Sequence, residues 1–226
     1  MTHDTESRMR ITDTGGKTAS HLLLRVCAAS IPTVAVLIGL YVFSNGWLTI
    51  AIYYTAVPVY IIATRQVKVF THLTRGVNAR LILLAASIFA LSGPAAYLAL
   101  PLAARSDTSL IDFLNAIGLG EWRYLVLAVI FCTVNPVLEE TFWRGTFRTD
   151  PDKLSWTDFA FAAFHIPVVL KVATLPLAIV CLAVLVLAGR FLRYLTHKTQ
   201  GLATPYLVHL TADISITVSI WYLANP

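Results

Sequence analysis

Ionisable side chains inside hydrophobic stretches are the first place to look for chemistry in this sequence. Glu139, Glu140, His165, His209 and Asp213 all fall within apolar runs of the 226-residue chain. Because charged groups are costly in hydrocarbon, those found there commonly serve ion transport, proton transfer or catalysis. A carboxylate near an imidazole can also activate a water molecule for hydrolysis. These five residues are therefore the candidate functional residues.

The spacing around the two glutamates predicts a buried ion pair and a separate free carboxylate. Glu140 and Arg144 are four residues apart, so they lie on one helix face with the acid on the favourable, amino-terminal side. Adjacent helical residues point about 100° apart, so Glu139 is expected to face away from that pair and to remain available as a proton acceptor. Pro136 should kink the helix and free a backbone carbonyl. Asn135 could equally pair with that carbonyl or belong to the site.

The two histidines show the same four-residue spacing. Phe161 precedes His165 by four positions, and Asp213 follows His209 by four. We expect the Phe161 ring to pack against the His165 imidazole, and the Asp213 carboxylate to orient or charge His209.

Composition and hydropathy predict the elements that must position these residues. The chain is 57% hydrophobic and 13% charged, whereas a soluble domain carries about 25% charged residues. Apolar runs of about 20 residues can cross a bilayer. The fold is therefore predicted to be an all-α polytopic transmembrane bundle of about seven spans, or eight, placed near 22–44, 47–64, 81–103, 124–147, 156–170, 172–192 and 203–223. Pro167 and Lys171 divide the fifth span from the sixth, and a short interface helix is expected within 105–122.

The distribution of charge predicts the domains and the orientation. Residues 1–21 are expected to form a disordered cytoplasmic tail, and residues 22–226 a single transmembrane domain. Eleven lysines and arginines fall on the side of the tail and three on the other, which places the amino terminus in the cytoplasm. The net charge of +5 is thus explained by the basic loops that set the orientation in the membrane, and no nucleic acid partner is expected.

The predicted spans bring the ionisable groups to a similar depth. Counted from the cytoplasmic ends of their spans, Glu139 lies about 12 Å deep, His165 about 14 Å and His209 about 9 Å. One cavity open to the cytoplasm could hold all three. This coincidence favours a functional site over three separate structural contacts.

The same residues carry a family resemblance. Residues 139–144 read EETFWR, residues 161–165 read FAAFH and residues 209–213 read HLTAD. In this order they resemble the EExxxR, FxxxH and HxxxN or HxxxD motifs of the CPBP family, the CAAX proteases and bacteriocin-processing intramembrane proteases that include Rce1. The resemblance covers roughly residues 124–223, and the first three spans are similar to the family only in being hydrophobic.

The resemblance implies a glutamate-type intramembrane endopeptidase that needs no cofactor. Glu139 with His165 would activate water, and His209 with Asp213 would stabilise the oxyanion, while Glu140, Arg144 and Phe161 support them. Some members have asparagine where this chain has Asp213, and an ionised aspartate cannot donate a hydrogen bond. Asp213 is therefore expected to hold His209.

Several alternatives stay open at this point. Glu139, His165 and His209 could bind zinc with one open position for water, although no metal is required for the glutamate mechanism. A proton- or ion-coupled carrier could use the same buried groups, and an inactive partner protein could keep the fold. The expected partners are the bilayer and a membrane peptide or lipidated protein, either prenylated CAAX or bacteriocin-like, in a prokaryotic cell membrane. Nothing in the sequence predicts the oligomeric state.

Overall fold

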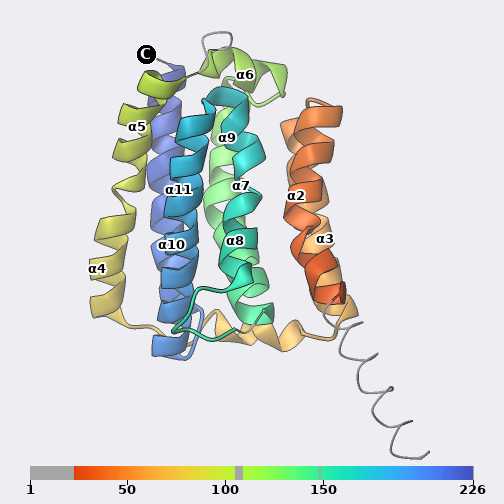
Figure 1. Ribbon diagram of the computed structural model, residues 1–226, viewed down its shortest axis with the longest axis vertical. Helices are drawn as coiled ribbons and strands as arrows, with labels where there is room; N and C mark the ends of the chain where they lie inside the picture. The colour runs from red at the N-terminus through yellow and green to blue at the C-terminus, as the bar shows by residue number, and fades with distance from the viewer. Residues whose placement is uncertain (1–22, 105–108, 148, 226) are drawn as a thin grey trace, which may run out of the picture.

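The described residues form a bundle of membrane-length helices. The computed structural model describes residues 23–104, 109–147 and 149–225, in which no β-strand occurs; the predicted tail, residues 1–21, lies outside them. Within this part of the chain, six helices are long and apolar enough to cross a membrane: Leu23–Val42, Gly46–Ala63, Ala79–Ala103, Trp122–Thr146, Leu175–Thr199 and Ala203–Ala224. They run side by side along the long axis (Figure 1). The all-α transmembrane fold is confirmed.

Several helices begin directly after a polar side chain that caps the first turn. The α-helices are α2 (Ile31–Val36), α3 (Gly46–Ala63), α4 (Ala79–Phe89), α5 (Ser92–Ala103), α6 (Leu110–Ala116), α7 (Trp122–Glu139), α8 (Trp156–Ala163), α9 (Ile166–Val172), α10 (Leu175–Thr199) and α11 (Ala203–Ala224). Two π-helices, η1 (Leu37–Val42) and η3 (Glu140–Thr146), and one 3-10 helix, η2 (Val67–His72), are also present, and residues 23–29 are helical as well. Asn45, Asn78 and Ser109 precede α3, α4 and α6, and each side chain accepts a hydrogen bond from a first-turn backbone N–H.

The predicted fifth span is not one helix but two short ones placed end to end. α8 has 8 residues and α9 has 7, and Phe164 and His165 lie between them. Pro167 occupies the first turn of α9, where the absence of an N–H costs least. Because proline has no N–H to donate, it cannot continue the hydrogen bonding of α8. α8 and α9 lie in line beside α10, so the segment still traverses the bundle (Figure 1).

The predicted sixth span is displaced toward the carboxyl terminus. It was expected over 172–192, but α10 covers Leu175–Thr199. Arg193, expected in a loop, is therefore buried within a helix, where its Nη2 donates to Asp158 Oδ2 at 2.5 Å and to the Lys153 carbonyl at 2.8 Å. This ion pair ties α10 to the beginning of α8.

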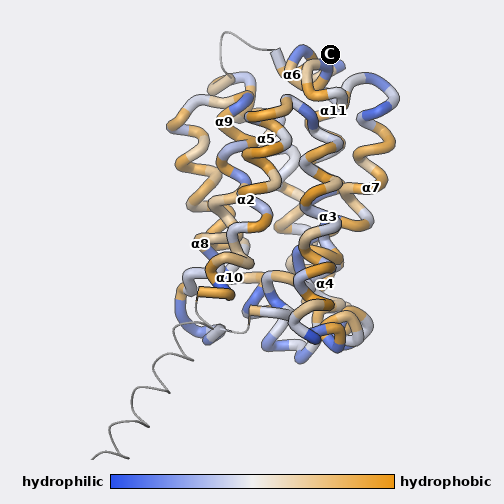
Figure 2. The backbone as a smooth tube through the Cα atoms, turned by 90° about the vertical axis from the view of Figure 1, so that its right-hand side faces the viewer, coloured by the Kyte–Doolittle hydropathy of each residue, from blue (hydrophilic) through white to orange (hydrophobic). Residues whose placement is uncertain are grey.

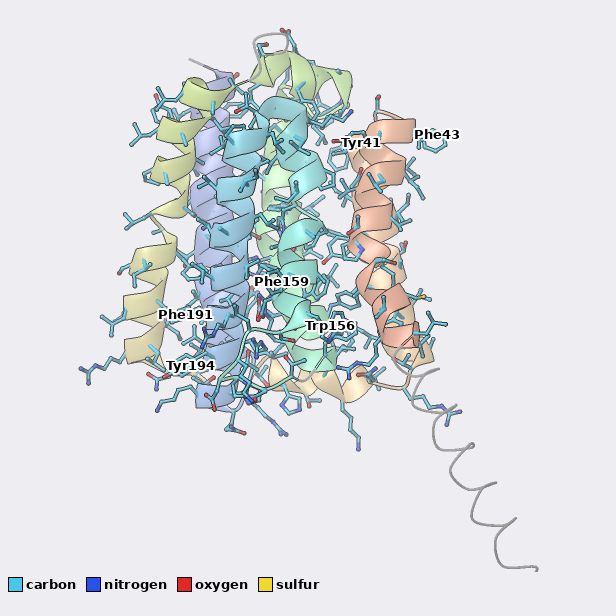
Figure 3. All side chains as sticks on the ribbon, in the orientation of Figure 1. Tyr41, Phe43, Trp156, Phe159, Phe191 and Tyr194 are labelled. Atoms are coloured by element: carbon cyan, nitrogen blue, oxygen red, sulfur yellow. The ribbon has the colours of Figure 1, made fainter. Side chains whose placement is uncertain are left out.

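α11 lies in the middle of the bundle and packs against α4, α5, α7 and α10. Its approach to α5 is close: a Cβ added to Gly93 would lie 2.2 Å from the Ser215 carbonyl oxygen, so only glycine fits. Ser215 Oγ also donates to the Ala90 carbonyl at 2.5 Å. The hydrophobic residues follow the helices and the hydrophilic ones gather toward the two ends (Figure 2).

The two ends of the bundle differ in construction. The loops that follow α3, η3 and α10 meet at the lower end in Figure 1, where Leu202 N–H donates to the His72 carbonyl at 2.9 Å and Thr204 Oγ1 to the Gly76 carbonyl at 2.6 Å. At the opposite end α6 lies beside the carboxyl terminus, and Leu114 is buried there. The short helix expected within 105–122 thus covers the end of the bundle.

Candidate active site

The first polar segment of the site is the end of the fourth long helix, where the backbone changes from α to π. Pro136 lies inside α7, and the π-helix starts at Glu140. Proline has no N–H to donate to the preceding turn, and the wider turn is stabilised where Thr146 Oγ1 donates to the Thr141 carbonyl at 3.1 Å. Single π-helical turns are frequent at functional sites. This turn directs both glutamates inward, and both are buried.

Glu140 is the partner of two basic groups. Its Oε1 accepts a hydrogen bond from Arg144 Nη1 at 3.0 Å and lies 2.8 Å from His209 Nδ1. The pair with Arg144 is the one that the spacing predicts. Asp213 was expected to hold His209, and it does lie near the other ring nitrogen at 3.6 Å, but the hydrogen-bonding contact is with Glu140.

Arg144 is held on all sides within the bundle. Its Nη2 donates to the Gly189 carbonyl of α10 at 3.4 Å, and its guanidinium lies 4.2 Å from the centre of the Phe161 ring. A cation over an aromatic face is stabilised by the ring quadrupole. Arg144 therefore balances the charge of Glu140 and packs over Phe161, while its own donors point to Glu140 and Gly189.

Glu139 has one oxygen that is anchored by a hydrogen bond and one that makes none with the described residues. Asn135 Nδ2 donates to Glu139 Oε1 at 2.8 Å, whereas Glu139 Oε2 is buried and has no hydrogen-bond partner among the described residues. The same amide nitrogen lies 3.3 Å from Asp213 Oδ2. Asn135 therefore links the two acids, and the signal for its role was its place four residues before Glu139.

His209 lies at the centre of three carboxyl groups. Its Nε2 is 3.8 Å from Glu139 Oε2 and 3.6 Å from Asp213 Oδ1, opposite the Nδ1 contact with Glu140. A carboxylate that is also bonded to an arginine accepts, so Nδ1 carries a proton. Nε2 faces the carboxyl oxygens of Glu139 and Asp213, which are acceptors. This surrounding suits a second N–H, carried by Nε2. Glu139, Glu140, His209 and Asp213 thus form one cluster.

His165 is close to this cluster but not in polar contact with it. Its Nδ1 lies 2.8 Å from the Phe161 carbonyl oxygen, and the Phe161 ring is 5.1 Å from the His165 ring and 6.2 Å from the His209 ring, centre to centre. Since a carbonyl only accepts, Nδ1 carries the proton and Nε2 is the free acceptor. The predicted packing of Phe161 on His165 is present, whereas a direct contact between His165 and Glu139 is not.

The zinc alternative finds no prearranged ligand set. Within residues 23–104, 109–147 and 149–225, no group of three or more His, Cys, Asp or Glu side chains is arranged to hold a metal ion. The nitrogen of His209 nearest to Glu140 is already a donor, which makes it unsuitable as a ligand without a change of partner. Zinc dependence stays a matter for chelation experiments.

Comparison with known protein families gives a match over part of the chain. Residues 121–215 match a protein-family model described as Type II CAAX prenyl endopeptidase Rce1-like. The matched stretch runs from the start of α7 into α11 and contains all of the cluster around His209. Neither a curated protein nor a solved structure matches the chain.

Proposed function

We propose that this integral membrane protein hydrolyses peptide bonds through a water molecule activated by Glu139, in keeping with the match of residues 121–215 to the Rce1-like type II CAAX prenyl endopeptidase model. The observation that carries this proposal is the geometry of the glutamate. One of its oxygens is held by Asn135, and the other is buried, makes no hydrogen bond with the described residues and lies 3.8 Å from an imidazole nitrogen. A carboxylate held in this way can accept a proton in a defined direction.

The hydrolysis needs one base and one donor. Glu139 takes a proton from water while the water oxygen bonds to the carbonyl carbon and the carbonyl oxygen becomes an oxyanion. His209, with Nδ1–H anchored on Glu140, donates from a protonated Nε2 to that oxyanion. When the C–N bond breaks, the proton on Glu139 passes to the leaving amine. His165 offers its free Nε2 as a second acceptor for the water.

The proposed site opens toward the cytoplasm. Glu139 lies seven residues before the end of its span and His209 six residues after the start of its own, or about 10 Å and 9 Å from the same end of the bundle. That end carries the basic loops, so we place it and the amino terminus on the cytoplasmic side. Accessibility labelling of single cysteines introduced at Lys153 and Glu121 tests this orientation.

The direct test is cleavage of a quenched lipopeptide by the full chain in lipid nanodiscs. Replacing Glu139→Gln keeps the shape and removes the base, so kcat should fall by about 10²–10⁴-fold. Glu121→Gln, the same change near the other end of α7, should leave kcat unchanged. Equal rates for both variants would contradict the proposal, and proton flux through liposomes without cleavage would support a carrier.

The substrate class needs a parallel comparison. A farnesylated peptide with a CAAX end, the same peptide without its lipid, and a bacteriocin-like leader peptide are assayed side by side. On the family match we expect the prenylated peptide to be cut fastest. Loss of cleavage on chelation with recovery on adding zinc would favour the metal-dependent alternative.

A further inference from the structure

Two tyrosine hydroxyls from α3 point into the bundle without a partner. The hydroxyl oxygens of Tyr53 and Tyr54 are buried and make no hydrogen bond with any side chain or backbone group that the structure describes. α3 lies outside the stretch 121–215 that matches the family. A buried hydroxyl that stays unpaired is costly, so its position calls for a functional reason.

Tyr53 belongs to the face of α3 that packs against the site helices. Tyr53, Val57 and Ile61, spaced four residues apart, are all buried, and Tyr53 shares a core cluster with Leu138 of α7. The centre of its ring lies 6.1 Å from that of Phe164 and 5.7 Å from that of Tyr54. Since the Phe164 ring is 3.9 Å from His165, Tyr53 stands at the break between α8 and α9.

The charged neighbours of both hydroxyls belong to the active site, and the acids Glu139 and Asp213 are common to both. Tyr53 is within electrostatic range of Glu139, Arg144 and Asp213, and Tyr54 of Glu139 and Asp213, with Glu139 the strongest charged neighbour of each. The unpartnered Glu139 Oε2 is buried in the same region. The Tyr53 and Tyr54 hydroxyls and Glu139 Oε2 are thus polar atoms without a hydrogen bond, buried where α3 packs against α7.

We propose that Tyr53 is a further catalytic residue whose hydroxyl donates a hydrogen bond to the carbonyl oxygen of the scissile peptide, with Tyr54 beside it. This inference rests on the proposed function. The oxyanion gains charge in the transition state, and tyrosine hydroxyls are among the donors that stabilise such charge. His209 supplies one donor from α11 and Tyr53 a second from α3, so the carbonyl oxygen is held from two helices.

The test compares two Tyr→Phe changes on one helix. Tyr53→Phe should lower kcat by about 10²–10³-fold, the usual loss for one oxyanion donor, with KM within about twofold. Tyr60→Phe is the matched control, because Tyr60 lies on α3 against the same cluster, while its polar neighbours are Arg25 and Gln66 and its ring contacts Phe142 and Phe147. It should retain full activity.

A second readout separates a catalytic hydroxyl from a packing role. The inhibition constant of a phosphinic peptide, which mimics the tetrahedral intermediate, should rise in Tyr53→Phe by the factor that kcat/KM falls. If the variant does not fold, fluorinated tyrosine at position 53 keeps the shape and changes the donor. A kcat that stays constant across these changes, while Glu139→Gln is inactive, overturns this inference alone. Full activity of Glu139→Gln overturns the proposed function as well.

Discussion

Two buried charge clusters in this bundle are built in opposite ways. Arg193 and Asp158 form a closed one: Arg193 Nε and Nη2 donate to the two oxygens of Asp158 at 3.1 and 2.5 Å, and the Ser155 N–H donates to the same carboxylate at 2.9 Å. The remaining guanidinium hydrogens reach the Asp150 and Lys153 carbonyls. Every charged atom here is paired within the protein, so this cluster can stabilise the fold but has nothing left to offer a substrate.

The cluster around His209 is open by comparison. One imidazole lies between Glu139, Glu140 and Asp213, and one oxygen of each glutamate makes no hydrogen bond with the described residues. Unpaired buried groups lower stability, and proteins keep them chiefly where function needs them. The contrast teaches that burial of charge does not identify a site, whereas incomplete pairing does.

The largest effect expected from this contrast is on stability. Asp158→Asn leaves the Arg193 guanidinium buried without its counter-ion, which should lower the free energy of unfolding by about 3 to 5 kcal/mol. Reversible unfolding in mixed detergent micelles measures this. At a temperature where the variant is folded, kcat should stay within about twofold, because the closed cluster touches no reacting group.

Asp152→Asn is the matched control for that variant. Asp152 lies in the same loop but is exposed, so the change should stay within about 0.5 kcal/mol. Unchanged stability of Asp158→Asn, together with a large loss of kcat, would show that the Arg193 cluster belongs to the active site.

Glu140 combines features of the closed and the open cluster, since it forms an ion pair with Arg144 and also anchors His209. Glu140→Gln should lower kcat/KM by about 10–100-fold, less than Glu139→Gln, because the imidazole loses its charged anchor while the base remains. Steady-state kinetics of both variants on one substrate provide the comparison. If Glu140→Gln were the more damaging of the two, with stability preserved, the roles of the two glutamates would have to be exchanged.

The sequence predicts the local part of the site well. Three motifs indicate the family resemblance, which the match over residues 121–215 confirms, and four-residue spacing predicts the pair of Glu140 with Arg144. These features depend only on neighbours along one helix, where the 3.6-residue period fixes which side chains meet. The same holds for the apolar runs from which the transmembrane helices are predicted.

Contacts between distant segments escape this reasoning. His209 finds Glu140 across 69 residues, and the link from Asn135 to Asp213 spans 78. Arg193 was expected in a loop because the sixth span was expected to end at residue 192, and its partner Asp158, 35 residues earlier, cannot be recognised from spacing. Likewise Pro167 indicates an interruption in the fifth span, but the break at His165 depends on how α8 and α9 pack against α10. Such pairings follow from helix packing, which no single helical period encodes.

The smallest expected effect concerns Asp213. Its Oδ1 lies 3.6 Å from His209 Nε2, too far for a hydrogen bond, while Glu140 already anchors the other ring nitrogen at 2.8 Å. Asp213→Asn should therefore lower kcat by less than about tenfold, because the amide keeps the shape and can itself donate to an oxyanion. Cleavage kinetics beside Asp152→Asn measure the difference. A loss of more than about 1,000-fold, equivalent to about 4 kcal/mol, would mean that the negative charge of Asp213 holds the second proton on His209, and that the open cluster needs all three acids.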